Sequence, residues 1–87
     1  MEAREATQEE IEKTKSWGDW SKEPSTFPYS YPETETCYIL EGEGEATDKA
    51  GKKITFRAGD WVVFPSGTEC TWHIIKTIKK KYHFGPL

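Results

Sequence analysis

Aliphatic and sulfur-containing residues are scarce in this chain of 87 residues. Only 34% of the residues are hydrophobic, and there are one methionine and two cysteines. No apolar stretch approaches the roughly 20 residues of a membrane-spanning helix, and we recognise no signal peptide, so we expect a cytoplasmic protein with no membrane partner. The cysteines, Cys37 and Cys70, match no zinc-ribbon spacing and are expected to be free thiols in a reducing compartment.

An excess of positive charge is also missing. Lysine and arginine number 12 against 15 aspartates and glutamates, which gives a net charge of −3. The one basic cluster, at 76–84, mixes lysines with apolar residues, which is typical of an exposed strand whose lysines face water. The charge therefore favours no nucleic-acid partner.

Aromatic residues supply most of the large apolar side chains that could form a core. Four tryptophans, four tyrosines and four phenylalanines make up 14% of it. Each can bury on the order of 150–250 Å², so a few of them can anchor a small core, and such a composition argues against disorder. A chain of this length forms one domain with a marginal core, to which dimerisation would add burial.

The order of polar and apolar segments predicts an all-β domain after a short leader. Residues 1–16 form a polar leader in which Thr7 and Glu10 have the spacing of a capping box, so we expect a short peripheral helix near 8–14. Residues 17–87 should form one domain of short strands separated by Gly and Pro turns, as in a β-sandwich or barrel. The expected strands are 35–41, 54–56, 61–64, 70–75 and 77–84. The first of these is apolar on both faces and should be covered on both.

Two sets of residues have the spacing of the cupin motifs. Gly59, Pro65, Gly67 and Cys70 follow the pattern of the second motif, G-x5-P-x-G-x2-H-x3-N, and Glu35 and Gly42 follow the end of the first, G-x5-H-x-H-x3-4-E-x6-G. Over residues 17–84 the chain resembles the small single-domain, RmlC-like cupins grouped with ureidoglycine aminohydrolase-like proteins. The resemblance implies a double-stranded β-helix, which is the cupin jelly-roll barrel, and a homodimer.

The resemblance also implies a changed set of metal ligands. Glu35 occupies the position of the glutamate ligand, but the histidine positions of the first motif are Tyr29 and Tyr31. The histidine position of the second motif is Cys70, and the closing asparagine position is Ile74. Zn²⁺ accepts thiolate and carboxylate, but the imidazoles that usually anchor such sites are missing. We therefore expect no cofactor and no tight metal site, and the aminohydrolase reaction itself is in doubt.

Strand alternation predicts which side chains meet inside the barrel. If Glu35 points inward, Cys37 does too, and if Cys70 points inward, so does Trp72 while His73 points outward. The expected ligand-binding residues are Tyr29, Tyr31, Glu35, Cys37, Cys70 and Trp72. Trp17, Trp20 and Phe27 are expected either to line the same pocket or to pack in the core and at a dimer interface.

Glu35 and Cys70 are the candidates for catalysis. A carboxylate between phenols and an apolar wall can act as a general acid or base, or can simply be a buried group held by tyrosine hydroxyls. Cys70 can serve as a nucleophile or as a small core residue, and no inward histidine or lysine is evident to activate it. Three functions stay open: a metal-free binder of a small molecule, an enzyme acting on a small nitrogenous or carbohydrate metabolite, and a structural dimer or partner-binding module.

Overall fold

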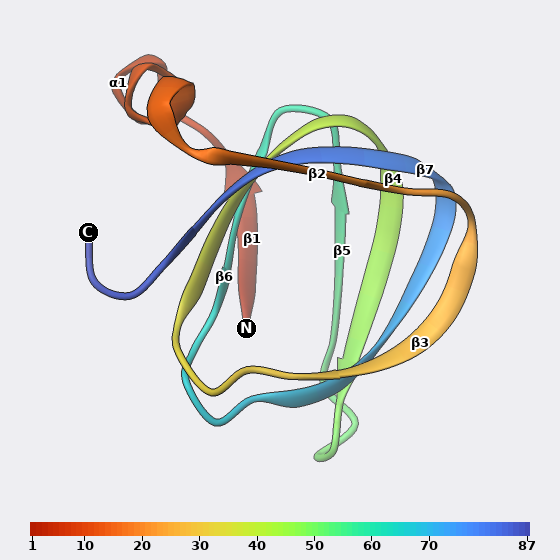
Figure 1. The fold of residues 1–87 in the computed structure, drawn as a ribbon. Coiled ribbons are helices and arrows are strands. Elements are labelled where there is room, and N and C mark those ends of the chain that lie inside the picture. Colours follow the sequence, from red (N-terminus) through yellow and green to blue (C-terminus); the bar gives the residue numbers. More distant parts are fainter.

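The computed structural model describes residues 1–87, which form antiparallel β-strands with one short α-helix near the N-terminus (Figure 1). The all-β fold expected from the sequence is confirmed. The elements are β1 (Glu2–Glu5), α1 (Gln8–Lys13), a 3₁₀ turn η1 (Thr14–Ser16), β2 (Gly18–Lys22), β3 (Ser25–Ser30), β4 (Glu35–Asp48), β5 (Lys53–Arg57), β6 (Asp60–Phe64) and β7 (Glu69–Phe84). No helix has the length and apolarity that crossing a membrane requires.

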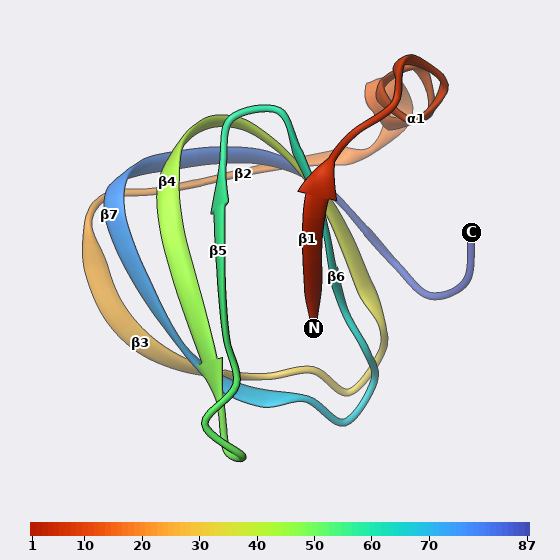
Figure 2. The same cartoon turned by 180° about the vertical axis from the view of Figure 1, so that it is seen from behind.

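Two long strands, β4 and β7, connect the two halves of the barrel. The first part of β4, 35–39, pairs with β6 and with the end of β7, whereas 43–48 pairs with β5 and with the start of β7. The end of β7 also pairs with β2, and its start pairs with β3. Register shifts along β4 between Ile39 and Gly44 bend the sheet between these parts. The sheet therefore folds onto itself as a jelly roll, with β1 and β5 on the side shown in Figure 2.

The segments expected at 70–75 and 77–84 form one continuous strand, because β7 is paired with β4 on both sides of the register shifts. The expectation that 35–41 is covered on both faces holds within the single chain for only part of the strand. Cys37 and Ile39 are fully buried on the inner face. On the outer face Thr36 is buried, Tyr38 is half-buried and Leu40 is 41% exposed. The outer face of β4 is therefore left uncovered by the chain itself at Leu40.

Aromatic rings join the two halves of the core. Tyr31 stacks on Phe64 with ring centroids 4.6 Å apart, and Phe64 lies 5.5 Å from Trp72. Trp72 in turn lies 4.9 Å from Phe56 of β5. All four side chains are nearly inaccessible to solvent. They supply the burial that the few aliphatic residues cannot, as the composition indicates.

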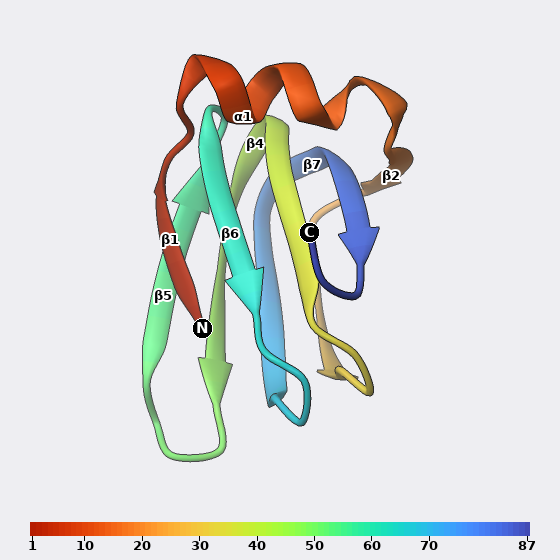
Figure 3. The same ribbon diagram turned by 90° about the vertical axis from the view of Figure 1, so that its left-hand side faces the viewer.

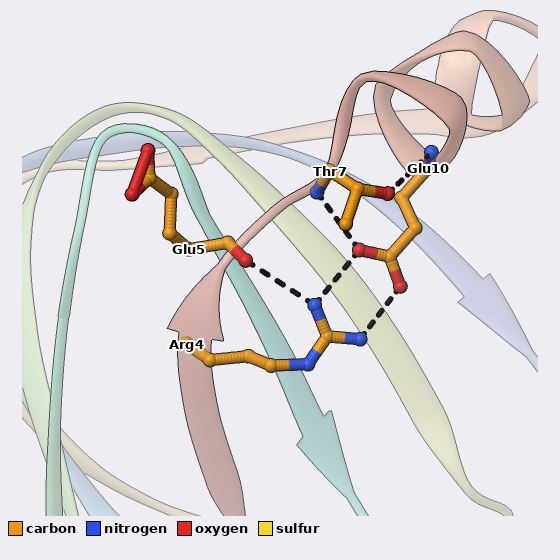
Figure 4. A network of polar contacts seen from close by, with 4 residues as sticks. All are labelled: Arg4, Glu5, Thr7 and Glu10. Carbon is orange, nitrogen blue, oxygen red and sulfur yellow. Dashed lines mark hydrogen bonds and ion pairs between the residues drawn. The ribbon is translucent and has the colours of Figure 1, made fainter.

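The N-terminal segment is anchored at both ends. The predicted helix is confirmed as α1, and Thr7 and Glu10 form both hydrogen bonds of a capping box. The helix lies across one end of the barrel (Figure 3). Residues 2–5 form β1 against β6, a strand that the sequence does not predict because the segment is mostly charged. The Arg4 guanidinium donates to both carboxylate oxygens of Glu10, at 2.8 and 2.6 Å, and so ties β1 to α1 (Figure 4).

Replacing Glu10 with glutamine is expected to lower the melting temperature by a few degrees at pH 7. The hydrogen bond and ion pair with Arg4 lower the pKa of Glu10 from 4.5 to about 2. The stabilisation is therefore complete above pH 4.5 and is lost as the pH falls from 4.5 towards 2. Melting curves of both proteins between pH 7 and pH 2 should converge at the acid end. A difference that stays constant over this range would contradict the assigned role of the carboxylate.

Candidate functional site

An open cavity of about 170 Å³ is lined by residues of β2, β3, the start of β4 and both halves of β7. Seven aromatic side chains and one carboxylate–ammonium pair form its wall. The lining residues are Trp20, Phe27, Tyr29, Tyr31, Glu35, Trp72, Lys80, Tyr82 and Phe84. A cavity of roughly 150 Å³ in another protein accommodates benzene. The space here therefore suits a single ring or a short chain.

A buried ion pair forms the polar part of this wall. Lys80 Nζ lies 3.0 Å from Glu35 Oε2, and the two side chains are only 6% and 5% exposed. Lys80 lies opposite Ile39 in the ladder, and its long side chain extends back along β4 to Glu35 at the start of that strand. The ammonium also contacts Cys37, whose sulfur lies 3.7 Å from Lys80 Nζ.

Two indole rings complete the surroundings of the ammonium. Lys80 Nζ lies 4.7 Å from the ring centroid of Trp20 and 4.9 Å from that of Trp72. Both distances are within the range of a cation–π interaction, which is strongest where the cation is desolvated. Glu35, Trp20 and Trp72 thus form a cage of one carboxylate and two aromatic faces around a cation that belongs to the chain itself.

The Tyr31 hydroxyl and the Glu35 carboxylate differ in their hydrogen bonds. The hydroxyl of Tyr31 accepts a bond of 2.9 Å from Trp72 Nε1. Burial and the nearby charge of Glu35 raise the pKa of Tyr31, so its phenol stays neutral. Glu35 Oε1, in contrast, has no partner within the protein, yet it is not sealed off from solvent. Because Glu35 lines the cavity, this oxygen is an acceptor available to a bound molecule.

The expectation that the lysines of 76–84 face water is wrong for Lys80. Lys76 and Lys79 do so, with side chains 69% and 53% exposed, but Lys80 is buried. The sequence contains a signal for this difference. Ile78 is fully buried, and strict alternation from it places residue 80 on the same inner face. The buried Glu35 also needs a partner. Lys80 is thus an inward lysine that the sequence analysis does not identify, but it contacts Glu35 and Cys37 and does not activate Cys70.

The structure brings together four of the six predicted ligand-binding residues. Tyr29, Tyr31, Glu35 and Trp72 line the cavity. Cys37 is fully buried and does not line the cavity, but it contacts the Lys80 ammonium. Cys70 is separate: it borders a second, polar hollow formed by the end of β3, the start of β7 and the end of β4 with its hairpin. That hollow has a volume of about 210 Å³ and is lined by Pro28, Tyr29, Ser30, Thr47, Asp48, Lys49, Glu69, Cys70 and Thr71.

The other sequence candidates divide between the cavity and the surface. Trp20 and Phe27 line the cavity, whereas Trp17 packs elsewhere, against Trp61 and His83. His73 points outward, as alternation predicts, and its Nδ1 lies 3.2 Å from Glu45 Oε1.

Neither cysteine has the environment of an activated nucleophile. Burial raises the pKa of Cys37 to about 12, although the Lys80 ammonium opposes this rise. Burial, with the charge of Asp48, also raises the pKa of Cys70. The reactive species is the thiolate, so both environments suppress reactivity.

Both thiols should react slowly with Ellman's reagent in the native protein at pH 8. For Cys37 the thiolate fraction alone falls ~1000-fold, because each pKa unit is a factor of ten. Cys70 should be slower than a free thiol by a smaller factor, and both should react at once in guanidinium chloride. The variant Cys70→Ser assigns the two rates. If Cys70 reacted as fast as a small free thiol, this description would be wrong, and Cys70 would again be a candidate nucleophile.

The folded sheet and the cavity at its open end define the class of protein: a small cupin jelly-roll barrel. The chain belongs to the family of EutQ-like cupin domains, whose model matches residues 9–82. A DUF861 family protein from Thermotoga maritima has a similar structure, with a TM-score of 0.91 and 38% sequence identity over 95% of this chain and 97% of that one.

Two EutQ proteins, one of them described as a putative ethanolamine utilization protein, have the same fold at lower identity. EutQ from Clostridium difficile is 19% identical, with a TM-score of 0.72 over 79% of this chain and 54% of that one. A putative EutQ from Salmonella typhimurium is 20% identical, with a TM-score of 0.72 over 97% of this chain and 68% of that one. At these identities the similarity shows the fold alone. The curated proteins contain no match to this sequence.

The side chains at the customary metal position of this fold do not suit a metal ion. No three histidine, cysteine, aspartate or glutamate side chains of the chain gather closely enough to hold one. The single carboxylate at that position, Glu35, already holds the Lys80 ammonium, and the neighbouring tyrosine Tyr31 is a neutral phenol. A divalent cation there would have to displace a buried positive charge at close range, which is unfavourable.

Proposed function

We propose that this cupin domain binds a small organic molecule in the aromatic cavity without the help of a metal ion. The observation that carries the proposal is the unused acceptor Glu35 Oε1 on a wall that is aromatic apart from the Glu35–Lys80 pair. Ligand pockets typically combine such an apolar wall with a few convergent polar groups. The aromatic faces supply contact area, and the carboxylate supplies orientation.

The cost of the buried pair supports a role in binding. Taking a carboxylate and an ammonium out of water costs several kcal/mol for each ion, and a buried pair often stabilises a fold no better than two apolar side chains. The side chains of Glu35 and Lys80 are both almost completely shielded from solvent. A pair that stabilises the fold poorly is more readily explained by what it does in the cavity.

A thermal-shift screen of small metabolites and divalent metal ions tests the proposal. A metabolite present at about 100 times its Kd stabilises the protein by about 2.7 kcal/mol, a rise in melting temperature on the order of 10 °C for a domain of this size. We expect such a rise without added metal. It should be lost in Glu35→Gln and kept in Glu33→Gln, a matched change at an exposed position nearby in the sequence. A metal-specific rise that disappears in Glu35→Gln would overturn the proposal.

An enzymatic role is the second candidate, favoured by the same free oxygen. A carboxylate with one unpaired oxygen at a cavity can accept a proton from a bound molecule as a general base. The reaction would act on a small nitrogenous or carbohydrate metabolite, as in the ureidoglycine aminohydrolase-like cupins that the sequence resembles. For an enzyme, Glu35→Gln should abolish turnover while leaving part of the affinity, whereas a pure binder should show no turnover in either form.

We also propose that the protein acts as a homodimer. Large apolar side chains lie exposed on the outer surfaces of β4 and β7, with Leu40 41% and Ile75 48% accessible. A second copy of the chain would cover such residues and add the burial that a domain of this size lacks. Sedimentation equilibrium of the wild type and of Leu40→Glu tests this: a dimer that the substitution weakens is expected, and a wild-type monomer at all concentrations would refute it.

A further inference from the structure

We infer that the occupant of the cavity is a small, neutral, planar molecule in which a carbonyl oxygen lies next to an N–H group, as in an amide or a lactam. This inference rests on the proposed binding function and specifies its ligand. Size, charge and the arrangement of hydrogen-bonding groups each contribute to it.

The apolar wall of the cavity favours a planar ligand. Phe27 and Trp72 lie stacked with centroids 5.9 Å apart, and Tyr82 and Phe84, which also line the cavity, lie 5.6 Å apart. With a volume of about 170 Å³, the space accommodates one ring but not two. Aromatic faces favour a planar partner, because offset stacking and edge contacts need a flat surface.

The ion pair presents an acceptor and a donor side by side. Glu35 Oε1 is the free acceptor, and it belongs to the carboxylate whose other oxygen receives the Lys80 bond at 3.0 Å. An ammonium has three N–H donors, and only two of those of Lys80 have polar partners, Glu35 and Cys37. The third has no polar partner within the protein, and Lys80 lines the cavity. A ligand that uses both groups needs an acceptor beside a donor, the pattern of C=O next to N–H.

The charges of the wall select for a neutral ligand. Glu35 and Lys80 compensate each other, and no other charged side chain lines the cavity. An anion would be repelled by Glu35 and a cation by Lys80, and in each case the group of opposite charge is already paired within the wall. A neutral amide meets both members of the pair without this penalty.

The test compares four single-ring probes by NMR titration. 2-Pyridone has the adjacent carbonyl and N–H, N-methyl-2-pyridone lacks the donor, and benzoate and benzylammonium carry one charge each. A lost hydrogen bond to a charged group should make 2-pyridone bind roughly 10- to 100-fold more tightly than its N-methyl analogue. The indole N–H signals of Trp20 and Trp72 should shift, while those of Trp17 and Trp61, outside the cavity, serve as internal controls.

The outcomes separate the inference from the proposed function. Equal affinity for the two pyridones, or tightest binding of benzoate or benzylammonium, would confirm an occupied cavity and refute the amide preference. No shift of Trp20 or Trp72 with any probe would overturn both. In the double variant Glu35→Leu/Lys80→Met, which removes both the acceptor and the donor, the two pyridones should bind equally, and a preference that survives there would show that the pair does not create it.

Discussion

Lys80→Met is expected to lower the free energy of unfolding by about 3–5 kcal/mol, because it leaves Glu35 as an unpaired buried carboxylate. The substitution keeps the approximate length of the side chain and removes its charge and its hydrogen bonds to Glu35 and Cys37. It also removes the cation from the faces of Trp20 and Trp72. Unfolding in guanidinium chloride, followed by tryptophan fluorescence, measures the loss.

The neighbouring lysine provides the matched control. Lys79 is 53% exposed, and its ion pair with Glu41 is 3.5 Å long, so Lys79→Met should change stability by no more than about 0.5 kcal/mol. Should Lys80→Met fail to fold, the double variant Glu35→Gln/Lys80→Met decides the question. Removing both charges should restore most of the stability, since no lone ion then remains buried. Equal effects of Lys79→Met and Lys80→Met, or a double variant as unstable as the single one, would contradict the buried pair.

Gly42→Ala should be the most damaging single change of a glycine in this chain. Gly42 has a φ of +99°, and a Cβ there would come into severe overlap with the backbone oxygen of Thr77 in β7. The oxygen belongs to the opposite strand and cannot move without breaking the ladder between β4 and β7. We expect a loss of about 4 kcal/mol or more, in the range that single substitutions seldom reach. The melting temperature and the solubility of the expressed protein report it.

Gly51 is the control for backbone strain alone. It has a φ of +88° in the hairpin between β4 and β5, and a Cβ added there would meet no other atom within 4 Å. Gly51→Ala should therefore cost only the about 1–2 kcal/mol of the left-handed conformation. If the two variants were equally stable, the close approach of β4 and β7 at Gly42 would be wrong. The close contact of Gly42 with Thr77 also explains why a glycine stands at the end of the first cupin motif.

The fold could be predicted because its signals are local. Glycines and prolines mark the turns around 57–60 and 65–68, and alternation marks the inner faces of the strands. The same alternation correctly places His73 outside and Trp72 inside. The strand β1 escapes prediction because its residues are mostly charged and its partner β6 lies far away in the sequence.

The candidate site was harder to predict because alternation gives the face of a residue and not its position along the strand. Cys70 and Trp72 share a face, yet Cys70 lies at the far end of β7, opposite Asp48, and borders a different hollow. Lys80 belongs to the other half of the same strand and reaches Glu35 only through its long side chain. The bend of β4 and β7 and the reach of one flexible side chain decide which residues meet, and strand alternation alone reveals neither.

Elemental analysis of the purified protein tests the central claim most directly: that an ammonium group of the chain, and not a metal ion, is the cation at Glu35. Protein prepared without chelators and with Zn²⁺, Mn²⁺ and iron present in the growth medium should contain far less than one transition-metal ion per chain. Glu35→Gln should give the same content as the wild type, since no ligand for a metal is lost. One metal ion per chain in the wild type, absent from Glu35→Gln, would contradict the claim.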